Sequence, residues 1–487
     1  MAMKLSELLK NIYAGPVDAS LGEIEIKMIA TDTRKMGKQS LFIAQKGFKF
    51  NGADFINEAI DKGAVVVAVE REQSALVPSG RIGCLVVDDT SQFLRDAAKI
   101  FYGNPSRKLI NIGVTGTNGK TTITYLIESI LAAAENSCGV IGTINYRYGG
   151  KSFPSINTTP GFLENQKYFA DLVDEGIEYN VMEVSSHALT QGRVDLVDFS
   201  TAVFTNLTSD HLDYHHNREN YFNAKAKLFT GLTPEATAVI NVDDEYGRKL
   251  CSKTDGKILT YGINNNADLK AVDVEFDLKG TQFKLITKDD EAIIRTKLIG
   301  AYNVYNVLAA CGVGISQNIS MEKIKKGIES LNAVPGRLER VDFGQNYYIF
   351  IDYAHTQDAF DNVLKTIRHF SSAKIMIVFG CGGDRDRTKR PEMGKVACQL
   401  ADYSIVTTDN PRSEDPMAIM NEILKGFDKK NYEVIVNREE AIHKAITLAQ
   451  PGDIILILGK GHETYQVFKD GTIAFDERQI VRQYVLC

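Results

Sequence analysis

The chain has 487 residues, of which 44% are hydrophobic and 24% charged, the balance of an ordinary soluble globular protein. At ~150 residues per domain, this length predicts about three domains. The formal net charge of −6 argues against nucleic acid as a partner, because phosphate binding needs a basic face. No stretch approaches the ~20 apolar residues of a membrane span. With seven dispersed cysteines and no signal-peptide pattern, we expect a cytoplasmic protein without membrane insertion.

The first hundred residues alternate strand and helix patterns. The opening MAMKLSELLKNIYAG resembles a short amphipathic helix, and apolar runs at 64–69 and 84–87 predict strands. This pattern, which continues to about Pro105, predicts a small α/β domain.

A glycine-rich segment follows, LINIGVTGTNGKTT at 109–122. Gly116 and Gly119 let backbone N–H groups approach phosphate oxygens, because no Cβ blocks them. Lys120 can reach the outer phosphates, and the Thr121 hydroxyl can bind Mg²⁺. The helix expected at roughly 121–134 directs its N-terminus at the same anion. The segment therefore predicts binding and cleavage of a nucleoside triphosphate. Its predicted contacts are Gly116, Thr117, Asn118, Gly119, Lys120, Thr121 and Thr122.

The central segment alternates apolar strands, predicted at 179–184, 201–205 and 238–241, with helical stretches. Glu183 closes the first of these strands, where it is placed either to hold Mg²⁺ or to cap the next turn. The cluster TSDHLDYHH at 208–216 favours a metal or phosphate role, although we expect His215 and His216 to lie at the surface. In the helical pattern YFNAKAKLF, periodicity does not separate Lys225 from Lys227.

The Pro-Gly turn at 334–337 predicts the next domain boundary. Strands predicted at 348–351, 375–378, 403–407, 434–436 and 454–458 indicate a doubly wound sheet that holds ligands at the strand C-termini. We therefore expect domains at 1–105, 106–335 and 336–487.

Nine motifs occur in one order: GTNGKTT, MEVSSH, TSDHLDYH, YFNAKAKLF, VPGRLE, DYAHT, GCGGDRD, DNPR and GKGHE. Together they resemble the Mur ligase family over essentially the whole chain, and within it the members that add the third peptide residue. The resemblance implies an N-terminal UDP-binding α/β domain, a central phosphate-loop ATPase domain with a mainly parallel sheet, and a C-terminal Rossmann-like domain. It implies ATP-dependent addition of meso-2,6-diaminopimelate to UDP-N-acetylmuramoyl-L-alanyl-D-glutamate, through an acyl phosphate, in peptidoglycan precursor synthesis.

The resemblance also assigns the nucleotide and metal site. Glu183 and His211 match metal-site residues, together with Thr121. Lys225 matches a lysine that the family carbamylates with CO₂, and the carbamate can help hold a second Mg²⁺. The nucleotide-side matches are Asn303, Asn306, Asp352 and His355. The implied catalytic residues are Lys120, His211, Lys225 and Arg337, the last reaching the triphosphate from the domain junction.

The precursor is expected between the first two domains. Its implied contacts are Thr31, Thr33, Arg34, Phe48, Lys49, Phe50, Asn157, Thr158, Thr159, Ser185, Gln191 and Arg193. The loop after Gly47 departs from the usual His-containing pattern of the family.

Specificity for the added amino acid is expected from the C-terminal domain. The implied diaminopimelate contacts are Arg385, Asp409, Asn410, Pro411, Arg412, Gly459 and Glu463. The planar guanidinium of Arg412 suits a carboxylate, whereas Asp409 and Glu463 suit ammonium groups. Lysine has no distal carboxylate, so it would leave Arg412 buried without a partner. DNPR therefore favours diaminopimelate over lysine.

Three alternatives remain: a lysine-adding ligase, a relative such as folylpolyglutamate synthase, and an ATP-binding regulatory module that has lost catalysis. DNPR argues against the first, and the UDP-type amino-terminal domain argues against the second. The intact catalytic residues argue against the regulatory module. The absence of ADP formation with all substrates present would favour it. We expect the protein to act as a monomer.

Overall fold

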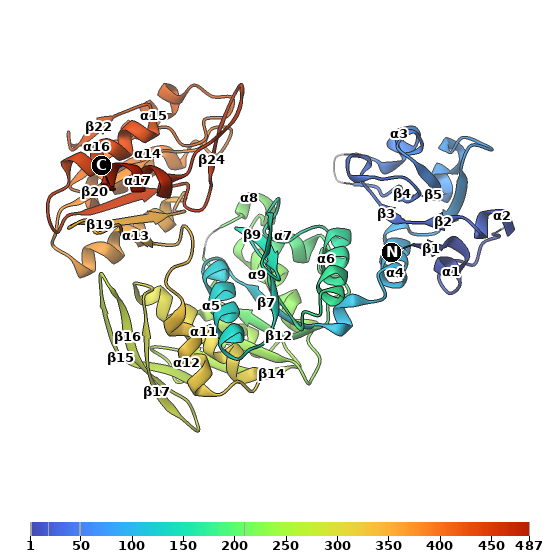
Figure 1. Cartoon of the computed structure of the whole chain (residues 1–487), viewed down its shortest axis with the longest axis horizontal. Helices are drawn as coiled ribbons and strands as arrows, with labels where there is room; N and C mark the ends of the chain where they lie inside the picture. Colours follow the sequence, from blue (N-terminus) through green and yellow to red (C-terminus); the bar gives the residue numbers. More distant parts are fainter. Residues whose placement is uncertain (1, 18, 48–49, 209, 487) are drawn as a thin grey trace.

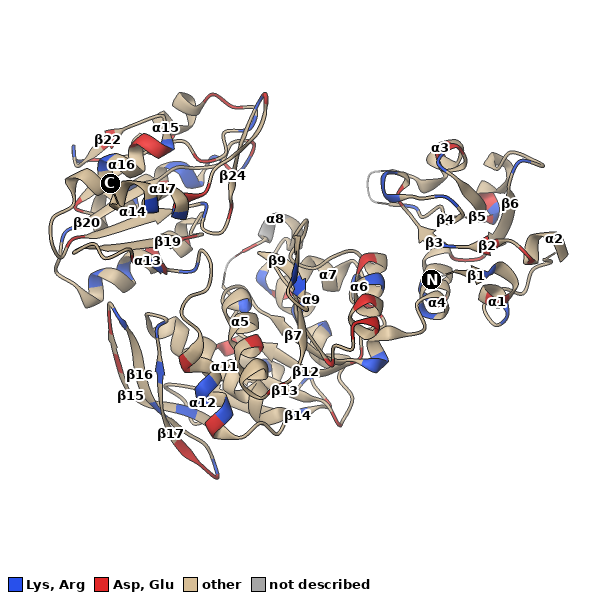
Figure 2. Ribbon diagram, viewed as in Figure 1, with Lys and Arg blue, Asp and Glu red and all other residues tan. Residues whose placement is uncertain are grey.

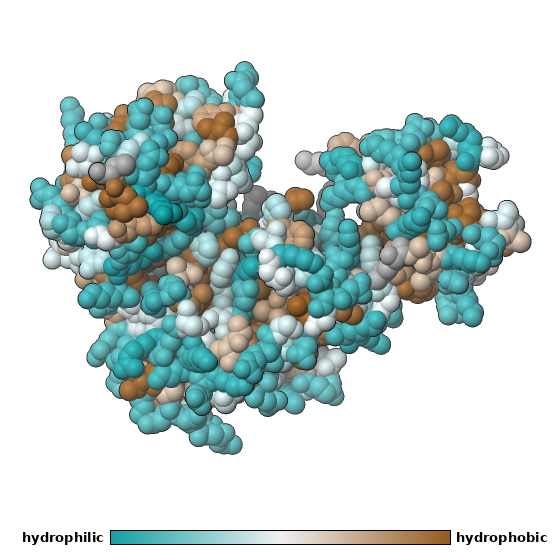
Figure 3. Space-filling model, viewed as in Figure 1, coloured by the Kyte–Doolittle hydropathy of each residue, from teal (hydrophilic) through white to brown (hydrophobic). Residues whose placement is uncertain are grey.

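The computed structural model of the chain describes residues 2–17, 19–47, 50–208 and 210–486. The chain forms three α/β parts, here called first, central and third, with the central part between the other two (Figure 1). In the space-filling view, the surface is hollowed between the first and third parts (Figure 3). The predicted fold class, three α/β domains with mainly parallel sheets, is confirmed. The limits at 105 and 335 stay a prediction.

The first part holds a four-stranded parallel sheet in the order β3-β4-β5-β6. The strands are β3 (Met28–Ala30), β4 (Ser40–Ile43), β5 (Ala64–Glu70) and β6 (Gly83–Val87), beside the small pair β1 (Met3–Lys4) and β2 (Glu25–Ile26). The helices are α1 (Leu5–Leu9), α2 (Ala19–Gly22), α3 (Ile56–Asp61) and α4 (Thr90–Phe101). Helix α4 begins where the Asp89 side chain accepts hydrogen bonds from two backbone N–H groups, and it buries Phe93 and Ala97 against the sheet.

The central part is built on an eleven-stranded sheet in the order β10-β9-β8-β11-β7-β12-β13-β14-β15-β16-β17. The strands are β7 (Ile110–Thr115), β8 (Cys138–Ile141), β9 (Asn145–Tyr148), β10 (Lys151–Pro154), β11 (Tyr179–Glu183), β12 (Phe199–Phe204), β13 (Thr237–Asn241), β14 (Lys257–Gly262), β15 (Leu269–Asp277), β16 (Gly280–Ile286) and β17 (Glu291–Thr296). The helices are α5 (Lys120–Ala133), α6 (Phe162–Asp174), α7 (Ser186–Thr190), α8 (Leu212–His215), α9 (Arg218–Thr230), α10 (Glu245–Leu250), α11 (Ala301–Ser316) and α12 (Met321–Ser330).

In the middle of this sheet the neighbours β8-β11-β7-β12-β13-β14-β15 run parallel, and antiparallel strands extend both of its edges. The parallel strands are apolar runs because they are covered on both faces. Ile123 of α5 and Val307 of α11 pack in the core on one face, and Phe169 of α6 and Phe229 of α9 pack in the core on the other.

The third part is a six-stranded sheet in the order β18-β19-β23-β20-β21-β22, parallel except for β18. The strands are β18 (Glu339–Val341), β19 (Tyr348–Asp352), β20 (Ile375–Phe379), β21 (Tyr403–Val406), β22 (Tyr432–Val434) and β23 (Ile454–Leu458), with a separate hairpin of β24 (Tyr465–Phe468) and β25 (Gly471–Ala474). The helices are α13 (Gln357–Phe370), α14 (Lys389–Leu400), α15 (Pro416–Leu424), α16 (Arg438–Leu448) and α17 (Glu477–Leu486). The loops that follow β20, β21 and β23 meet at one edge of the sheet, where α/β folds hold ligands.

The turn between β15 and β16 joins the central sheet to the third part. Its Leu278 packs against the core of the third part, and the Phe276 ring lies 5.0 Å from the ring of Phe370 in α13. Figure 1 shows these long antiparallel strands reaching toward α13. The sequence pattern did not predict this contact.

Two surface properties agree with the composition. Lys and Arg are interspersed with Asp and Glu along all three parts (Figure 2). Within the described residues, every helix is too short or too polar to cross a membrane.

Candidate active site

The phosphate-binding segment forms the turn from β7 into α5. Gly119 has a φ of 92°, and a Cβ there would lie 2.4 Å from Asn306 Oδ1. A Cβ on Gly116, at φ 148°, would lie 1.8 Å from Thr205 Oγ1, so both positions require glycine. Lys120 begins the helix, and its Nζ donates to the carbonyl oxygens of Gly116 and Thr117 at 3.0 and 2.8 Å. The helix N-terminus and this ammonium therefore lie together, as an anion site needs.

Glu183 lies at the end of β11, beside the start of α5. Its carboxylate is 1% exposed and accepts a hydrogen bond from Thr121 Oγ1 at 3.0 Å. The backbone N–H and the hydroxyl of Thr143 donate to the same carboxylate at 2.8 and 3.0 Å. The carboxylate thus supports the turn after β8, and it also forms with the Thr121 hydroxyl a set of hard oxygen donors. Such a set fits Mg²⁺.

Three histidines, His187, His211 and His215, lie together at α7 and α8. His211 has a φ of 53°, its ring centroid lies 4.9 Å from that of His187, and its Nε2 lies 3.6 Å from Asp210 Oδ2. The prediction that His215 lies at the surface is wrong: it is buried, with Nε2 2.9 Å from Ser186 Oγ. The short helix α8 directs the His215 ring inward, toward Ser186 of α7. His216 is exposed, as predicted.

The structure separates the two lysines of α9. Lys225 is 2% exposed, its Nζ donates to the Gly116 carbonyl oxygen at 2.8 Å, and it lies 4.5 Å from the centroid of the Tyr221 ring. Lys227 is exposed. Burial, reinforced by the neighbouring charge of Lys120, holds the pKa of Lys225 well below its usual range. This shift favours the neutral amine more than in a solvent-exposed lysine.

The two asparagines of α11 lie beneath the phosphate loop. Asn303 Nδ2 donates to the Ile299 carbonyl oxygen, and Asn306 Nδ2 donates to Asn303 Oδ1, both at 2.9 Å. Both side chains are buried, so they do not form a solvent-facing polar face at the helix start. Asn306 Oδ1 instead faces the position of Gly119.

Arg337 reaches from the third part to the central part. Its Nη2 lies 3.3 Å from Thr121 Oγ1, and its guanidinium stacks 5.0 Å from the centroid of the Tyr353 ring. Asp352 accepts hydrogen bonds from the backbone N–H groups of Leu338 and Ala354, which ties the turn of Arg337 to the end of β19. Burial raises the pKa of Asp352, and the charge of Arg337 opposes that shift. Nδ1 of His355 lies 2.8 Å from the Tyr353 carbonyl oxygen.

A cavity of about 750 Å³ opens between these groups and the loops of the third part. Six of the seven predicted diaminopimelate contacts line it, together with Asp210, His211 and His355 of the predicted nucleotide and metal region. These six residues are Arg385, Asp409, Asn410, Arg412, Gly459 and Glu463. Pro411 is buried and does not line the cavity. Tyr353 and Lys389, to which the sequence motifs assigned no role, also line it.

Arg412 enters this cavity from an unusual backbone conformation. Its φ of 53° lies in the left-handed region, which costs an L-residue free energy. The backbone N–H of Arg412 donates to the Val467 carbonyl oxygen at 3.0 Å, and its Nη1 donates to that of Gly383 at 2.8 Å. The DNPR turn is thus fixed between the GCGGD loop and strand β24.

A buried arginine braces the same two loops from behind. Arg390 donates from both terminal nitrogens to Glu414, at 2.9 and 2.8 Å, and from one to Glu422 at 2.8 Å. It also donates to the Gly382 carbonyl oxygen, while Glu414 accepts from the backbone N–H of Asp384. The hydrogen bonds from Arg390 lower the pKa of Glu414 to about 2.

The predicted precursor contacts fall into two groups. The first group lies in the first part and comprises Thr31, Thr33, Arg34 and Phe50. Thr33 is buried and its hydroxyl donates to Glu58, whereas Arg34 forms an ion pair with Asp32. Phe50 is 70% exposed. Phe48 and Lys49 lie outside the described residues. The second group, in the central part, lies beside Glu183 and comprises Asn157, Thr158, Thr159, Ser185, Gln191 and Arg193.

In the second group the side chains contact one another. Thr159 Oγ1 donates to the Glu183 carbonyl oxygen at 2.8 Å, and Arg193 donates to the Thr159 carbonyl oxygen and to Gln191 Oε1. An ion pair between Lys35 and Glu164 connects the first part to the central part. The two predicted groups therefore lie in neighbouring parts of the chain.

Comparison with known proteins agrees with this architecture. The profile for the Mur ligase family catalytic domain matches residues 25–102, that for the Mur ligase middle domain matches 114–314, and that for the Mur ligase glutamate ligase domain matches 336–461. These matches span all three parts, and the chain belongs to the Mur ligase family.

Relatives match over the full length. UDP-N-acetylmuramoyl-L-alanyl-D-glutamate–2,6-diaminopimelate ligase of Clostridium tetani is 43% identical over 485 residues, and that of Geobacillus thermodenitrificans is 44% identical over 491 residues; each match covers 99% of both chains. A solved structure of a ligase of that name has 33% sequence identity and a TM-score of 0.71, and the match covers 100% of this chain and 99% of the other.

Proposed function

We propose that this protein is an ATP-dependent ligase that joins meso-2,6-diaminopimelate to UDP-N-acetylmuramoyl-L-alanyl-D-glutamate in peptidoglycan precursor synthesis. The observation that carries the proposal is the cavity, which places the cations Arg385 and Arg412 with the carboxylates Asp409 and Glu463. An amino-acid head with one carboxylate and one ammonium complements such a set. The relatives with 43–44% identity carry the name of this activity.

The proposed reaction forms one amide bond and cleaves one phosphoanhydride bond. An oxygen of the D-glutamate γ-carboxylate attacks the γ-phosphorus of ATP, giving an acyl phosphate and ADP. The diaminopimelate amine then attacks the acyl carbon, phosphate leaves with the bonding electrons, and the amine gives up a proton. Lys120 and Arg337 would stabilise charge on the transferred phosphoryl group, since both lie at the phosphate loop.

Thr121, Glu183 and His211 would hold Mg²⁺; the hydroxyl of Thr121 already contacts the carboxylate of Glu183. When bound, the ion neutralises phosphate charge and orients the nucleotide. The lowered pKa of Lys225 suits addition of its amine to CO₂: an N–C bond forms, the nitrogen loses a proton, and an anionic carbamate results. Carbamate oxygens at this position would complete a second Mg²⁺ site, which is the role that we propose for Lys225.

Asn303, Asn306, Asp352 and His355 would contact the nucleotide. In support, Asn306 Oδ1 faces the position of Gly119, and His355 lines the cavity. The two groups of precursor contacts would hold the UDP and peptide ends of the precursor. We propose that the protein acts as a cytoplasmic monomer, which sedimentation of the purified chain would test.

The proposal is tested by phosphate release with Mg·ATP and the UDP-dipeptide precursor, comparing meso-diaminopimelate with L-lysine. Release with diaminopimelate alone, together with the tripeptide product, is the expected result. Release with lysine instead would keep the ligase and discard the role of Arg412. The absence of release with both amino acids would refute the ligase and favour a regulatory module.

A further inference from the structure

Behind the cavity lies Lys460, a lysine of the GKGHE motif to which the motif assigned no role. Lys460 follows β23, and its side chain is 0% exposed. A fully buried ammonium is costly unless its donors are satisfied. Its Nζ donates to Asn410 Oδ1 and to Glu463 Oε2, both at 3.0 Å, and lies 5.5 Å from the centroid of the Tyr465 ring.

The two acceptors are also bonded to each other. Asn410 Nδ2 donates to Glu463 Oε2 at 2.8 Å, which closes a triangle of three side chains. Asn410 Oδ1 accepts a second hydrogen bond, from the backbone N–H of Val467 at 3.0 Å. Two donors at one atom identify it as the oxygen, so the orientation of the Asn410 amide is defined.

This triangle determines which atoms face the cavity. Its hydrogen bonds converge on Oε2 of Glu463, whereas Oε1 accepts none from the residues that the structure describes. Glu463 and Asn410 both line the cavity, but Lys460 does not. Glu463 therefore keeps one carboxylate oxygen for an incoming ammonium group, and Asn410 keeps one N–H for an incoming carboxylate.

We propose that Lys460 is a positioning residue for amino-acid specificity. It does not touch the substrate; it holds Glu463 and Asn410 so that the first accepts from the ammonium and the second donates to the carboxylate of one amino-acid head. The inference rests on the proposed function, because it concerns the amino acid that the ligase adds.

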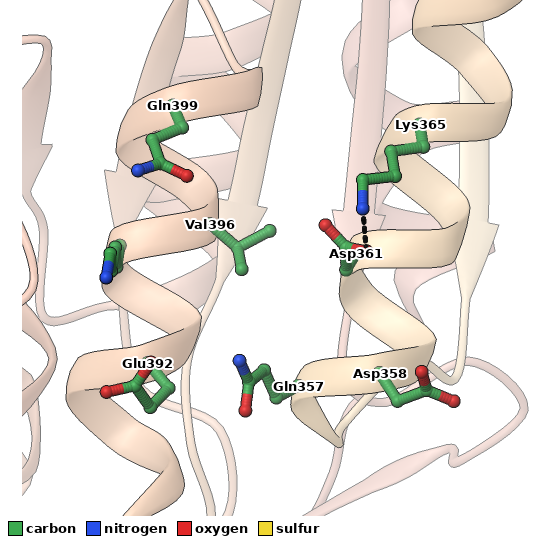
Figure 4. Close-up of a pocket in the computed structure, with 8 residues that line it drawn as sticks. Gln357, Asp358, Asp361, Lys365, Glu392, Val396 and Gln399 are labelled. Carbon is green, nitrogen blue, oxygen red and sulfur yellow. Dashed lines mark ion pairs between the residues drawn. The ribbon is translucent and has the colours of Figure 1, made fainter. Parts of the chain in front are cut away.

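The test compares steady-state kinetics of the wild-type chain with those of Lys460→Met, which keeps the length of the side chain and removes its charge. We expect the KM for diaminopimelate to rise about tenfold or more, because Glu463 and Asn410 lose their shared donor, with the KM for ATP within about twofold. A matched control is Lys395→Met. Lys395 is an exposed lysine of α14 that does not line the active-site cavity. It belongs to a separate groove between α13 and α14, whose labelled residues Figure 4 shows.

A second comparison asks whether Lys460 acts through Glu463. Glu463→Gln and the double variant Lys460→Met/Glu463→Gln should differ less in KM for diaminopimelate than Lys460→Met differs from the wild type, because the lysine then positions Asn410 alone. Independent, multiplying effects would overturn the inference. So would a folded Lys460→Met enzyme whose KM for diaminopimelate is unchanged or rises together with that for ATP.

If Lys460→Met does not fold, Lys460→Gln takes its place, since its amide can still donate one hydrogen bond but carries no charge; the same results then support or overturn the inference. If the wild-type chain makes no product with diaminopimelate, the proposed function fails. Lys460 is then tested with the amino acid that the wild type accepts, and an unchanged KM for it overturns the inference.

Discussion

Replacing Arg412 by glycine should remove amino-acid specificity without weakening the fold. Arg412 adopts a φ of 53°, and left-handed backbone costs an L-residue roughly 1–2 kcal/mol, which glycine does not incur. Against that gain, the unfolded chain is more flexible with glycine at this position, and ordering it on folding costs about 0.5–1 kcal/mol. The lost hydrogen bond from Nη1 to the Gly383 carbonyl oxygen costs about 1 kcal/mol more. The three contributions nearly cancel.

Arg412→Ala provides the matched comparison. Alanine loses the same hydrogen bond but keeps the left-handed backbone, so it should be less stable than the glycine variant by roughly 1 kcal/mol. Both variants lose a bidentate partner for the distal carboxylate of diaminopimelate, worth ~3 kcal/mol or roughly a hundredfold in KM. The KM for ATP should stay close to that of the wild type.

Urea unfolding and phosphate-release kinetics measure both effects on the same preparations. A glycine variant that is less stable than the alanine variant would refute the strain argument. Full use of diaminopimelate by either variant, or equal losses for diaminopimelate and ATP, would refute the specificity argument.

Two other predictions concern buried charges. Lys225→Ala should be nearly inactive and partly restored by added short carboxylates, which mimic a carbamate, whereas the exposed Lys227→Ala should keep its activity; full activity of Lys225→Ala would end the carbamate proposal. Arg390→Met should lower the thermal unfolding midpoint most above about pH 4.5, because the pKa of Glu414 is held at about 2 in the fold against an ordinary 4.5. A lowered carboxyl pKa contributes stability that is present above pH 4.5 and is lost as the pH falls toward 2. The difference in unfolding midpoint between the wild type and Arg390→Met should therefore become smaller on acidification. A difference that stays constant down to pH 3 would contradict this.

The sequence predicted the parallel strands well because both faces of each are buried, which produces short, uninterrupted apolar runs. The run at 454–458 matches β23 at both ends, whereas the strand predicted at 434–436 lies at Tyr432–Val434, a half-buried edge strand without such a run. Strands β15 to β17 alternate apolar and charged residues on a half-exposed sheet, so no continuous run marks them.

The residues around the cavity could be named from motifs, but their environment could not. Lys225 and Lys227 differ by two positions in one helix, and only packing against Gly116 and Tyr221 shows which of them is buried. His215 became a buried residue because a helix of four residues turns it toward Ser186. Such differences arise from contacts between distant segments, which local patterns do not encode.

The apolar contact at the turn between β15 and β16 has a mechanical consequence. Leu278 and Phe276 hold the central sheet against the third part at a point far along the chain from the peptide link near Arg337. Ile299, which precedes α11, is also buried in the core of the third part. Moving the third part would therefore expose the half-buried leucine and separate the two phenylalanine rings. A change in the angle between the two parts must break or rearrange these apolar contacts, in addition to bending the chain near Arg337.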